Sequence, residues 1–328
     1  MKNLADIRRS IPASSFEISP FKSWMTFSRI ALLLAISLWL ETLTENILFL
    51  IPLWLFHGQV LVGLFVLGHD CGHNSFSKNK TMNLVMGHLA FSPLGNGLIN
   101  WTLTHNHHHA HTQLKGQDVD WSKWLMTKEE YQKATWSKNF AGKLGYQLPF
   151  GIFFWIWLNA IRRGLSNPSS SVKKSNFIMW SIMISLYAGL ANTSGLWGMI
   201  KYHAIPASIA MFTGYFLLTI QHANEKSKWF LEKSWTPMRG QLESTFDVRF
   251  PRALEWLWLD INIHVPHHVA PGMPWYRLRA ARLAILNDHR EHYQERIFSM
   301  DELSWMLKTP HLFFDEVKLH FRIDTEAR

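Results

Sequence analysis

The feature that most constrains the fold of this chain is a block of 39 residues, Ile30 to Gly68, in which Glu41 and Glu45 carry the only formal charges. A single crossing of a bilayer takes about 20 apolar residues. The block is therefore long enough for two crossings, and the polar stretch ETLTEN (41–46) is predicted to be the turn between them. The stretch FHGQ (56–59) is the alternative position for this break.

A second apolar region has the same organisation. Residues 176–192 and 203–221 each lack Asp, Glu, Lys and Arg, and a short segment separates them. They predict a second hairpin, so we expect an all-α integral membrane protein with four transmembrane helices in two hairpins. Two weaker apolar windows, 81–100 and 147–160, are predicted to be helices that lie at the membrane interface.

The basic residues predict the orientation, because cytoplasmic flanks are enriched in Lys and Arg. The turn at 41–46 has neither, residues 193–202 have Lys201 only, and the first 29 residues contain Lys2, Arg8, Arg9, Lys22 and Arg29. Both termini and the long central loop are therefore expected in the cytoplasm, with the chain in a bacterial inner membrane. The expected parts of this single domain (1–328) are an N-terminal segment (1–29), the first hairpin (30–68), a loop (69–175), the second hairpin (176–221) and a C-terminal region (222–328).

The charge balance restricts the partners. The chain has 33 Lys and Arg against 24 Asp and Glu, a net charge of +9 that is concentrated on the predicted cytoplasmic side. Topology and attraction to anionic lipids explain such an excess, and a docking surface for an acidic protein is the alternative. No recognition motif accompanies the charge, so a nucleic acid partner is not expected. The single cysteine, Cys71, excludes an internal disulfide and a cysteine-ligated cluster.

Three short motifs contain most of the candidate metal ligands among the 18 histidines. Residues at i and i+4 share a face of a helix, as in the zinc-binding HExxH motif. HxxHH spacing is therefore predicted to point all three of its imidazoles in one direction. The motifs are GHDCGHNSF with His69 and His73, HNHHHAHT with His105, His108 and His109, and HVPHH with His264, His267 and His268.

The predicted topology brings these motifs together. An even number of crossings separates them, so all three are expected on the cytoplasmic side of the membrane. His222, directly after the last crossing, is a candidate ninth ligand on the same side. Pro266 has no N–H to donate, which is tolerated in the first turn of a helix, so the third motif is predicted to open a helix. His107 is expected to point away from the face of its motif.

The number and type of ligands predict two metal ions. A structural zinc takes four protein ligands and a catalytic zinc three, so eight or nine imidazoles exceed the needs of one ion. Calcium and magnesium prefer oxygen ligands, whereas imidazole suits zinc, copper, iron and nickel. A centre of this kind at a membrane surface is compatible with two iron ions that activate oxygen.

The motifs resemble those of the membrane fatty-acid desaturase family, whose pattern is HxxxH, HxxHH and HxxHH. The resemblance extends over roughly residues 30–285 and is specific for the acyl-lipid desaturases of the delta-12 and omega-3 type. It is carried by GHDCGHNSFS, WTLTHNHHHAHT, WTPMRGQLESTF (235–246) and NIHVPHHVAPGMPWYRLRAA (262–281). It implies a four-helix membrane bundle with a cytoplasmic helical cap that carries a di-iron site. The implied iron ligands are His69, His73, His105, His108, His109, His222, His264, His267 and His268.

One position departs from the pattern of the related acyl-CoA desaturases. Their asparagine four residues before the extra histidine, which joins the metal sphere through water, corresponds to Leu218 here. Asn262 is a possible substitute, and a turn or cap is its alternative role. Carboxylates usually orient metal-bound imidazoles. The candidates for this role, each with surface polarity as the alternative, are Asp70, Asp118, Asp120 and Glu225.

The resemblance implies an oxygen-dependent enzyme that introduces a cis double bond into an acyl chain of a membrane lipid, with two Fe²⁺ ions and O2. Because the chain has no nicotinamide, heme or iron–sulfur motif, electrons are expected from a separate ferredoxin, flavodoxin or cytochrome. A carotenoid ketolase or hydroxylase, or a fatty-acid hydroxylase, is the alternative on the same scaffold. A non-enzymatic membrane metal-binding or transport protein is a third, for which ionisable residues within the crossings are expected. No oligomeric state is predicted.

Overall fold

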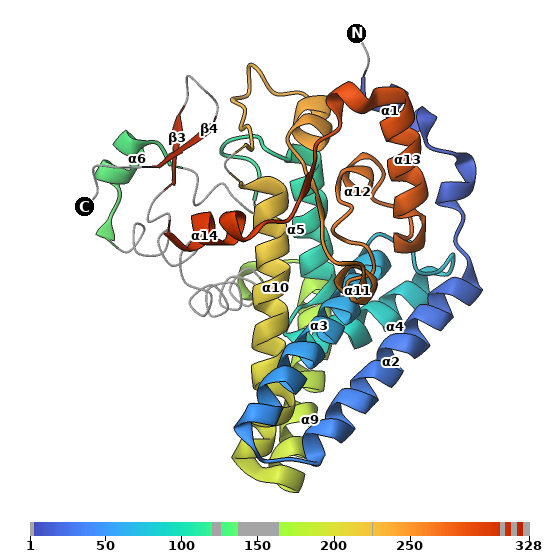
Figure 1. Cartoon of the computed structure of the whole chain (residues 1–328). Coiled ribbons are helices and arrows are strands. Elements are labelled where there is room, and N and C mark those ends of the chain that lie inside the picture. The colour runs from blue at the N-terminus through green and yellow to red at the C-terminus, as the bar shows by residue number, and fades with distance from the viewer. Residues whose placement is uncertain are drawn as a thin grey trace.

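The computed structural model describes residues 3–119, 126–136, 164–224, 226–308, 312–315 and 320–323. This part of the chain is mostly helical (Figure 1). The α-helices are α1 (Leu4–Ser10), α2 (Pro20–Thr42), α3 (Ile47–Gly72), α4 (Lys80–Phe91), α5 (Leu98–His111), α6 (Lys128–Lys133), α9 (Ser170–Met199), α10 (Ile205–His222), α11 (Arg252–Leu257), α12 (Val265–Val269), α13 (Leu278–His289) and α14 (Met300–Lys308). The strands are β1 (Asp247–Arg249), β2 (Glu295–Ile297), β3 (Leu312–Asp315) and β4 (His320–Ile323).

Among the described residues, three helical segments are long and apolar enough to cross a membrane, namely Pro20–Thr42, Ile47–Gly72 and Ser170–His222. The first two enclose the predicted turn, and the alternative break at 56–59 lies inside α3. The helix α2 begins ten residues before the apolar block, at Pro20 instead of residue 30. The reason is local: Ser19 caps the helix and proline is favoured at a first helical position.

The third segment covers both apolar stretches of the predicted second hairpin but lacks the predicted loop at 193–202. Helical residues run from α9 through a π-helical turn (Ile200–Ala204) into α10, with one break at Gly195. Gly195 has a φ of +64°, a conformation that glycine adopts without steric cost. One residue therefore replaces the expected loop. Figure 1 shows α9 and α10 meeting at the end of the molecule where the α2–α3 turn also lies.

Close helix contacts place α3 at the centre of this region, against α2, α4 and α10. A Cβ atom on Gly58 would lie 2.5 Å from the Ile209 side chain, and one on Gly63 would lie 2.4 Å from the carbonyl oxygen of Leu257. Glycine at these positions therefore allows α10 and α11 to approach α3. At the turn end, Lys201 Nζ donates to Glu45 at 2.6 Å and so connects the two apolar regions.

The opposite end carries α1, α12 and α13, which surround a second apolar core (Figure 1). Two short sheets are also present, one pairing β1 with β2 in parallel and one pairing β3 with β4 antiparallel. The described part of the chain is mostly helical, as expected, and the pairing of residues 247–249 with 295–297 is a feature that the sequence pattern did not predict. The predicted interfacial segment 81–100 forms α4, with Leu84, Val85 and Leu89 exposed, but it breaks after Phe91. The predicted helix at 147–160 lies outside the described residues.

Candidate metal centre

Four helix ends bring the nine predicted histidines together at the end of the molecule that holds α12 and α13. His69 is in the last turn of α3 and His73 is the residue that caps this helix. The second motif occupies the last two turns of α5, and His222 is the final residue of α10. His264 caps α12, which contains His267 and His268 with Pro266 in its first turn, as predicted. All are buried except His73, which is partly buried.

The first histidine group consists of His69, His73, His105 and His267, and their candidate ligand nitrogens all lie within 4.8 Å of one another. The Nε2 atom of His69 is 3.0 Å from that of His267 and 3.2 Å from that of His105. His109 adjoins this group, because its Nε2 atom is 3.0 Å from Nε2 of both His105 and His267. Five imidazoles therefore converge on one small volume.

The second histidine group consists of His108, His222 and His268, whose candidate ligand nitrogens also lie within 4.8 Å of one another. His264 adjoins it, with its Nε2 atom 2.9 Å from Nε2 of His222 and 3.1 Å from Nε2 of His268. The rings of His109 and His268 are 4.3 Å apart, so the two groups are neighbours. The arrangement has the ligand number expected for two ions.

The prediction that each HxxHH motif points in one direction is wrong. In the second motif His105 and His109 face the first group and His108 faces the second, whereas in the third motif His264 and His268 face the second group and His267 the first. An α-helix turns about 100° per residue, so i+4 lies about 40° to one side of i and i+3 about 60° to the other. The i and i+4 imidazoles stay together, and the i+3 imidazole crosses to the other group.

Burial keeps these imidazoles neutral. It lowers the pKa values of five histidines well below the ordinary range, and the neighbouring histidines lower them further; the five are His105, His109, His264, His267 and His268. A neutral imidazole has a lone pair on one nitrogen, as a metal ligand requires. The Nε2 atom of His73 is buried without a hydrogen-bond partner in the part of the chain that the structure describes. The two groups contain imidazole and no carboxylate, a donor set that suits iron, zinc or copper.

Polar contacts orient the second group. Asp118 Oδ1 lies 2.8 Å from Nδ1 of His108 and its Oδ2 accepts the backbone N–H of Gln113 at 2.9 Å. The Thr112 hydroxyl donates to the His108 carbonyl oxygen at 2.8 Å and lies 3.3 Å from Nδ1 of His268. A hydrogen bond at Nδ1 fixes the tautomer in which Nε2 is free to bind metal. Both Nδ1 contacts therefore direct Nε2 into the group.

The first group is held mainly by aromatic packing. The indole of Trp101 stacks on the ring of His105, with centroids 4.4 Å apart. Asp70 Oδ1 is 3.4 Å from Nδ1 of His69, a long contact, and its Oδ2 accepts the backbone N–H of Trp275 at 3.0 Å. His107 is exposed and makes its contact with the backbone of Gln117, away from both groups.

The other candidates lie elsewhere. Asp120 and Glu225 are outside the described residues. The Asn262 amide nitrogen donates to the Val248 carbonyl oxygen and to Glu255 Oε1, both at 3.0 Å. These contacts tie the segment before α12 to β1, which is a structural position.

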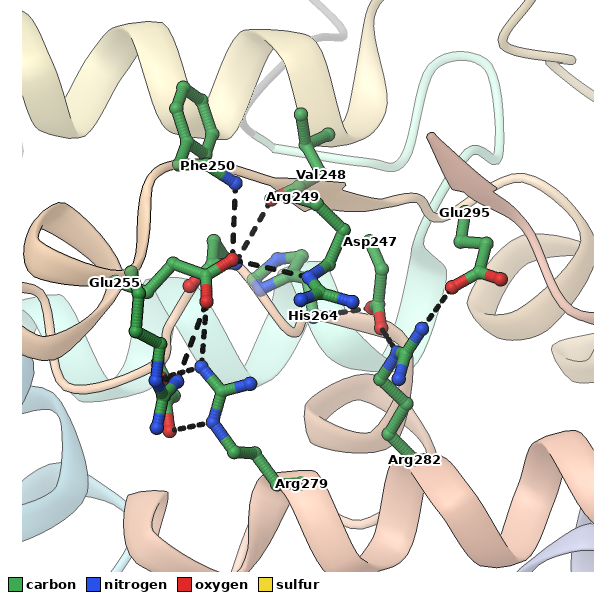
Figure 2. Close-up of polar contacts among 12 residues, drawn as sticks. Asp247, Val248, Arg249, Phe250, Glu255, His264, Arg279, Arg282 and Glu295 are labelled. Carbon is green, nitrogen blue, oxygen red and sulfur yellow. Dashed lines mark hydrogen bonds and ion pairs between the residues drawn. The ribbon is translucent and has the colours of Figure 1, made fainter. Parts of the chain in front are cut away.

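Sequence reasoning missed Asp247, a fully buried residue of β1 (Figure 2). Its Oδ1 accepts the backbone N–H groups of His264 at 2.7 Å and Val265 at 2.8 Å, and its Oδ2 accepts the Tyr293 hydroxyl. Arg282 approaches Oδ2 at 3.5 Å and also pairs with Glu295 (Figure 2). Burial raises the pKa of Asp247 to about 7, while the hydrogen bonds from Tyr293 and the two backbone groups lower it. This carboxyl group therefore fixes the start of α12.

Glu255 plays a similar part on the other side of the same strand (Figure 2). Its buried carboxylate accepts the backbone N–H of Phe250 at 3.1 Å, Nε of Arg249 at 3.2 Å and a guanidinium N–H of Arg279 at 2.7 Å. Asp260 also pairs with Arg279. No spacing in the sequence identifies Asp247 or Glu255, because their contacts depend on how β1 packs against the third motif.

Comparison with known proteins agrees with this geometry. A family model described as fatty acid desaturase matches residues 17–299. This chain belongs to the fatty acid desaturase family. The desaturase is 31% identical to an sn-1 oleoyl-lipid 12-desaturase of Picosynechococcus sp., over 94% of this chain and 90% of the relative. It is 29% identical to the protein of the same name from Synechocystis sp., with coverage of 95% and 90%.

A chloroplastic omega-6 fatty acid desaturase of Glycine max is 28% identical to the desaturase, over 89% of this chain and 69% of the relative. Family membership confirms the predicted enzyme class, an oxidoreductase of fatty acids. The matched region contains all nine clustered histidines and Asp247. The two histidine groups able to hold metal ions are therefore part of the region that defines this desaturase family.

Proposed function

We propose that this desaturase introduces a cis double bond at the delta-12 position of a monounsaturated acyl chain in a membrane lipid. The observation that carries the proposal is the pair of adjacent, buried imidazole groups in a chain whose relatives act on oleoyl-lipids by name. The reaction removes two hydrogens from neighbouring methylene carbons. With two electrons and two protons, these hydrogens reduce O2 to two waters.

The two groups would divide the ligands of two ferrous ions. His69, His73, His105, His109 and His267 would hold one ion, and His108, His222, His264 and His268 would hold the other. When bound, the ions supply the oxygen activation needed to attack an unactivated methylene. The chain supplies neutral ligands in a buried volume from which water is excluded. Asp118 and Thr112 keep the imidazoles of His108 and His268 in the ligating tautomer.

The membrane arrangement that supports this reaction has four crossings, namely α2, α3, α9 and α10. Large apolar side chains are exposed along α2, α3 and α9, including Leu32, Trp39, Leu48, Phe49 and Phe177. Exposed apolar surface of this extent is typical of contact with lipid. With Gly195 as the second turn, all nine histidines lie on one side of the bilayer. The distribution of Lys and Arg supports the prediction that this is the cytoplasmic side.

The electrons come from a separate carrier protein of the ferredoxin, flavodoxin or cytochrome class. The basic excess of the chain favours an acidic partner, because complementary charge accelerates encounter.

The experiment that tests the function is expression in a bacterium that makes saturated and monounsaturated lipids and supplies a ferredoxin. The fatty acids are profiled by gas chromatography and mass spectrometry. We expect a new diunsaturated acid with its second double bond at the delta-12 position. His108→Ala removes a histidine of the second group and should abolish this product, whereas His107→Ala, an exposed neighbour in the same motif, should retain it.

Other products would contradict the proposal. A hydroxylated fatty acid, or a modified carotenoid in a carotenoid-producing host, would assign the alternative chemistry on this scaffold. An unchanged profile from iron-loaded protein in the membrane would show that the substrate is not a lipid acyl chain of this host.

A further inference from the structure

The segment 226–239 packs directly on the end of α5, which carries the second histidine motif. The backbone N–H of Phe230 donates to the Gln113 carbonyl oxygen at 2.9 Å, and the N–H of Lys115 donates to the Phe230 carbonyl oxygen at 2.9 Å. The Trp235 indole N–H donates to the Thr112 carbonyl oxygen at 2.8 Å. The segment therefore contacts the residues that directly follow the second histidine motif.

A short chain of contacts runs from this segment into the second histidine group. Trp235 is partly exposed and its indole bonds to the backbone of Thr112. The hydroxyl group of the same threonine lies 3.3 Å from Nδ1 of His268. Two noncovalent contacts and one residue thus connect an indole at the surface to a ligand position of the second group.

The outer face of this segment is basic with an apolar centre. Its exposed cations are Lys226, Lys228, Lys233 and Arg239, against one acidic residue, Glu232, between positions 226 and 239. Leu231 is 38% exposed beside the partly exposed Trp235. Trp and Arg are enriched at the centres of protein interfaces, and charged side chains form their rims. We name this face the 226–239 surface.

A second cationic region of the molecule has a different character. Arg249, Arg252 and Arg279 surround the buried carboxylates of Glu255 and Asp260 and pair with them. Most of the positive charge there is compensated within the protein (Figure 2). That region therefore offers less charge to an acidic partner than the 226–239 surface does.

We propose that the 226–239 surface is the docking site of an acidic one-electron carrier protein and that Trp235 and Thr112 connect it to the second histidine group. The proposal rests on the proposed function. With iron bound in the two histidine groups, each docking event would oxidise the carrier by one electron and reduce the metal centre by one electron. Two such events supply the two electrons needed for each double bond. Interfaces of redox partners are small, and an apolar centre with basic side chains around it suits an acidic partner.

The first test measures binding, independently of product formation. The iron-loaded full chain in lipid nanodiscs is titrated with an acidic plant-type ferredoxin. Binding is expected to weaken by about tenfold when the ionic strength rises from about 20 to about 200 mM, because salt screens charges at the surface. The triple variant K226E/K228E/K233E should weaken binding by about tenfold or more at low salt.

A charge-matched control distinguishes docking from net charge. The triple variant K78E/K173E/K174E makes the same change at exposed lysines of other segments and should keep the wild-type affinity. Equal weakening in both variants, or full binding to K226E/K228E/K233E, would overturn the proposal. Thermal unfolding and iron content of each variant verify that the exposed substitutions leave the fold intact.

The second test addresses the connection through Trp235. Trp235→Phe removes the indole N–H and leaves the charges in place, so ferredoxin should bind as before. The rate at which bound ferredoxin is oxidised should fall by about tenfold, while an unchanged rate would overturn the role of Trp235. The lipid profile separates the two proposals: ferredoxin binding without any diunsaturated acid contradicts the function only. Wild-type levels of that acid from K226E/K228E/K233E contradict the docking site only.

Discussion

His105 of the first histidine group stacks on Trp101, whereas His108 of the second group bonds to Asp118 at 2.8 Å. The same contrast extends to the rest of the groups. The second group has polar contacts from Asp118 and Thr112 to its imidazoles and from Asp247 to the backbone of His264. Among the described residues, the carboxylate contact to the first group, from Asp70 to His69, is long at 3.4 Å. Aromatic stacking therefore contributes more to the positions of the imidazoles in the first group, and hydrogen bonds at the ring nitrogens contribute more in the second.

This contrast has a structural cause. The first group lies at the end of α3, where the apolar packing of the membrane helices reaches the histidines through Trp101 and Phe91. The second group adjoins the end of α5 and the loop after it, which contribute Thr112 and Asp118, and the strand β1, which contributes Asp247. Loops and strand ends provide such groups, whereas apolar helices do not.

Acid should destabilise the fold through histidines of both groups, and this is the largest effect expected. The five histidines with lowered pKa values stay neutral in the folded protein, but they take up protons below about pH 6.5 when unfolded. Each histidine therefore stabilises the fold fully above that pH, and its contribution falls by about 1.4 kcal/mol per pH unit below it. The thermal unfolding midpoint of metal-free protein should decrease steeply between about pH 7 and 5.

Two carboxyl groups act in the opposite direction. Burial raises the pKa of Asp247 to about 7 and that of Asp260 to about 6, so the folded protein holds protons there that the unfolded chain has released. Five histidines outweigh these two groups. A midpoint that stays constant or rises on acidification would show that the buried imidazoles are not neutral in the fold.

Asp247→Ala should produce the next largest effect. It removes the acceptor of two backbone N–H groups at the start of α12 and leaves Arg282 without its buried partner, which costs about 3–5 kcal/mol of stability. Binding of a spectroscopic probe metal such as Co²⁺ should be weakened more in the second group than in the first. Asp288→Ala, at an exposed position of α13, is the matched control and should change neither property.

Asp118→Asn tests the polar contacts of the second group directly. The amide oxygen accepts a weaker hydrogen bond from Nδ1 of His108 than a carboxylate does, and the amide NH2 group favours the opposite imidazole tautomer by donating to Nδ1. Co²⁺ affinity should therefore fall by about 10–100-fold. Asp70→Asn at the longer contact to His69 should have a smaller effect. Equal losses in the two variants, measured by competition with a chelator, would contradict the contrast between the groups.

Trp101→Phe is expected to have the smallest effect and to act on the first group. A phenyl ring retains most of the stacking on His105, so stability should fall by about 1 kcal/mol. The Co²⁺ spectrum of the first group should shift while that of the second is unchanged. A shift in the Co²⁺ spectrum of the second group, with that of the first unchanged, would show that Trp101 does not position the first group.

Much of the candidate site could be predicted from local spacing. The i, i+4 pairs, the helix start at Pro266 and the outward position of His107 follow from helix geometry and proline chemistry. The division of each HxxHH motif between two groups could not be predicted, because it requires knowing that a second set of histidines stands on the other side. Asp247 carried no signal for the same reason: its partners are 17 and 46 residues away in sequence.

The sequence by itself determined the apolar helices, the end of these helices at which the histidines gather and the kind of metal that these ligands suit. These properties depend on hydrophobicity, charge and ligand chemistry, which belong to single residues and short windows. The tertiary structure decided which imidazoles face each other, which carboxylates orient them and which segment packs on the end of α5. Those properties depend on distances between segments far apart in the chain, and such distances exist only when the helices have packed.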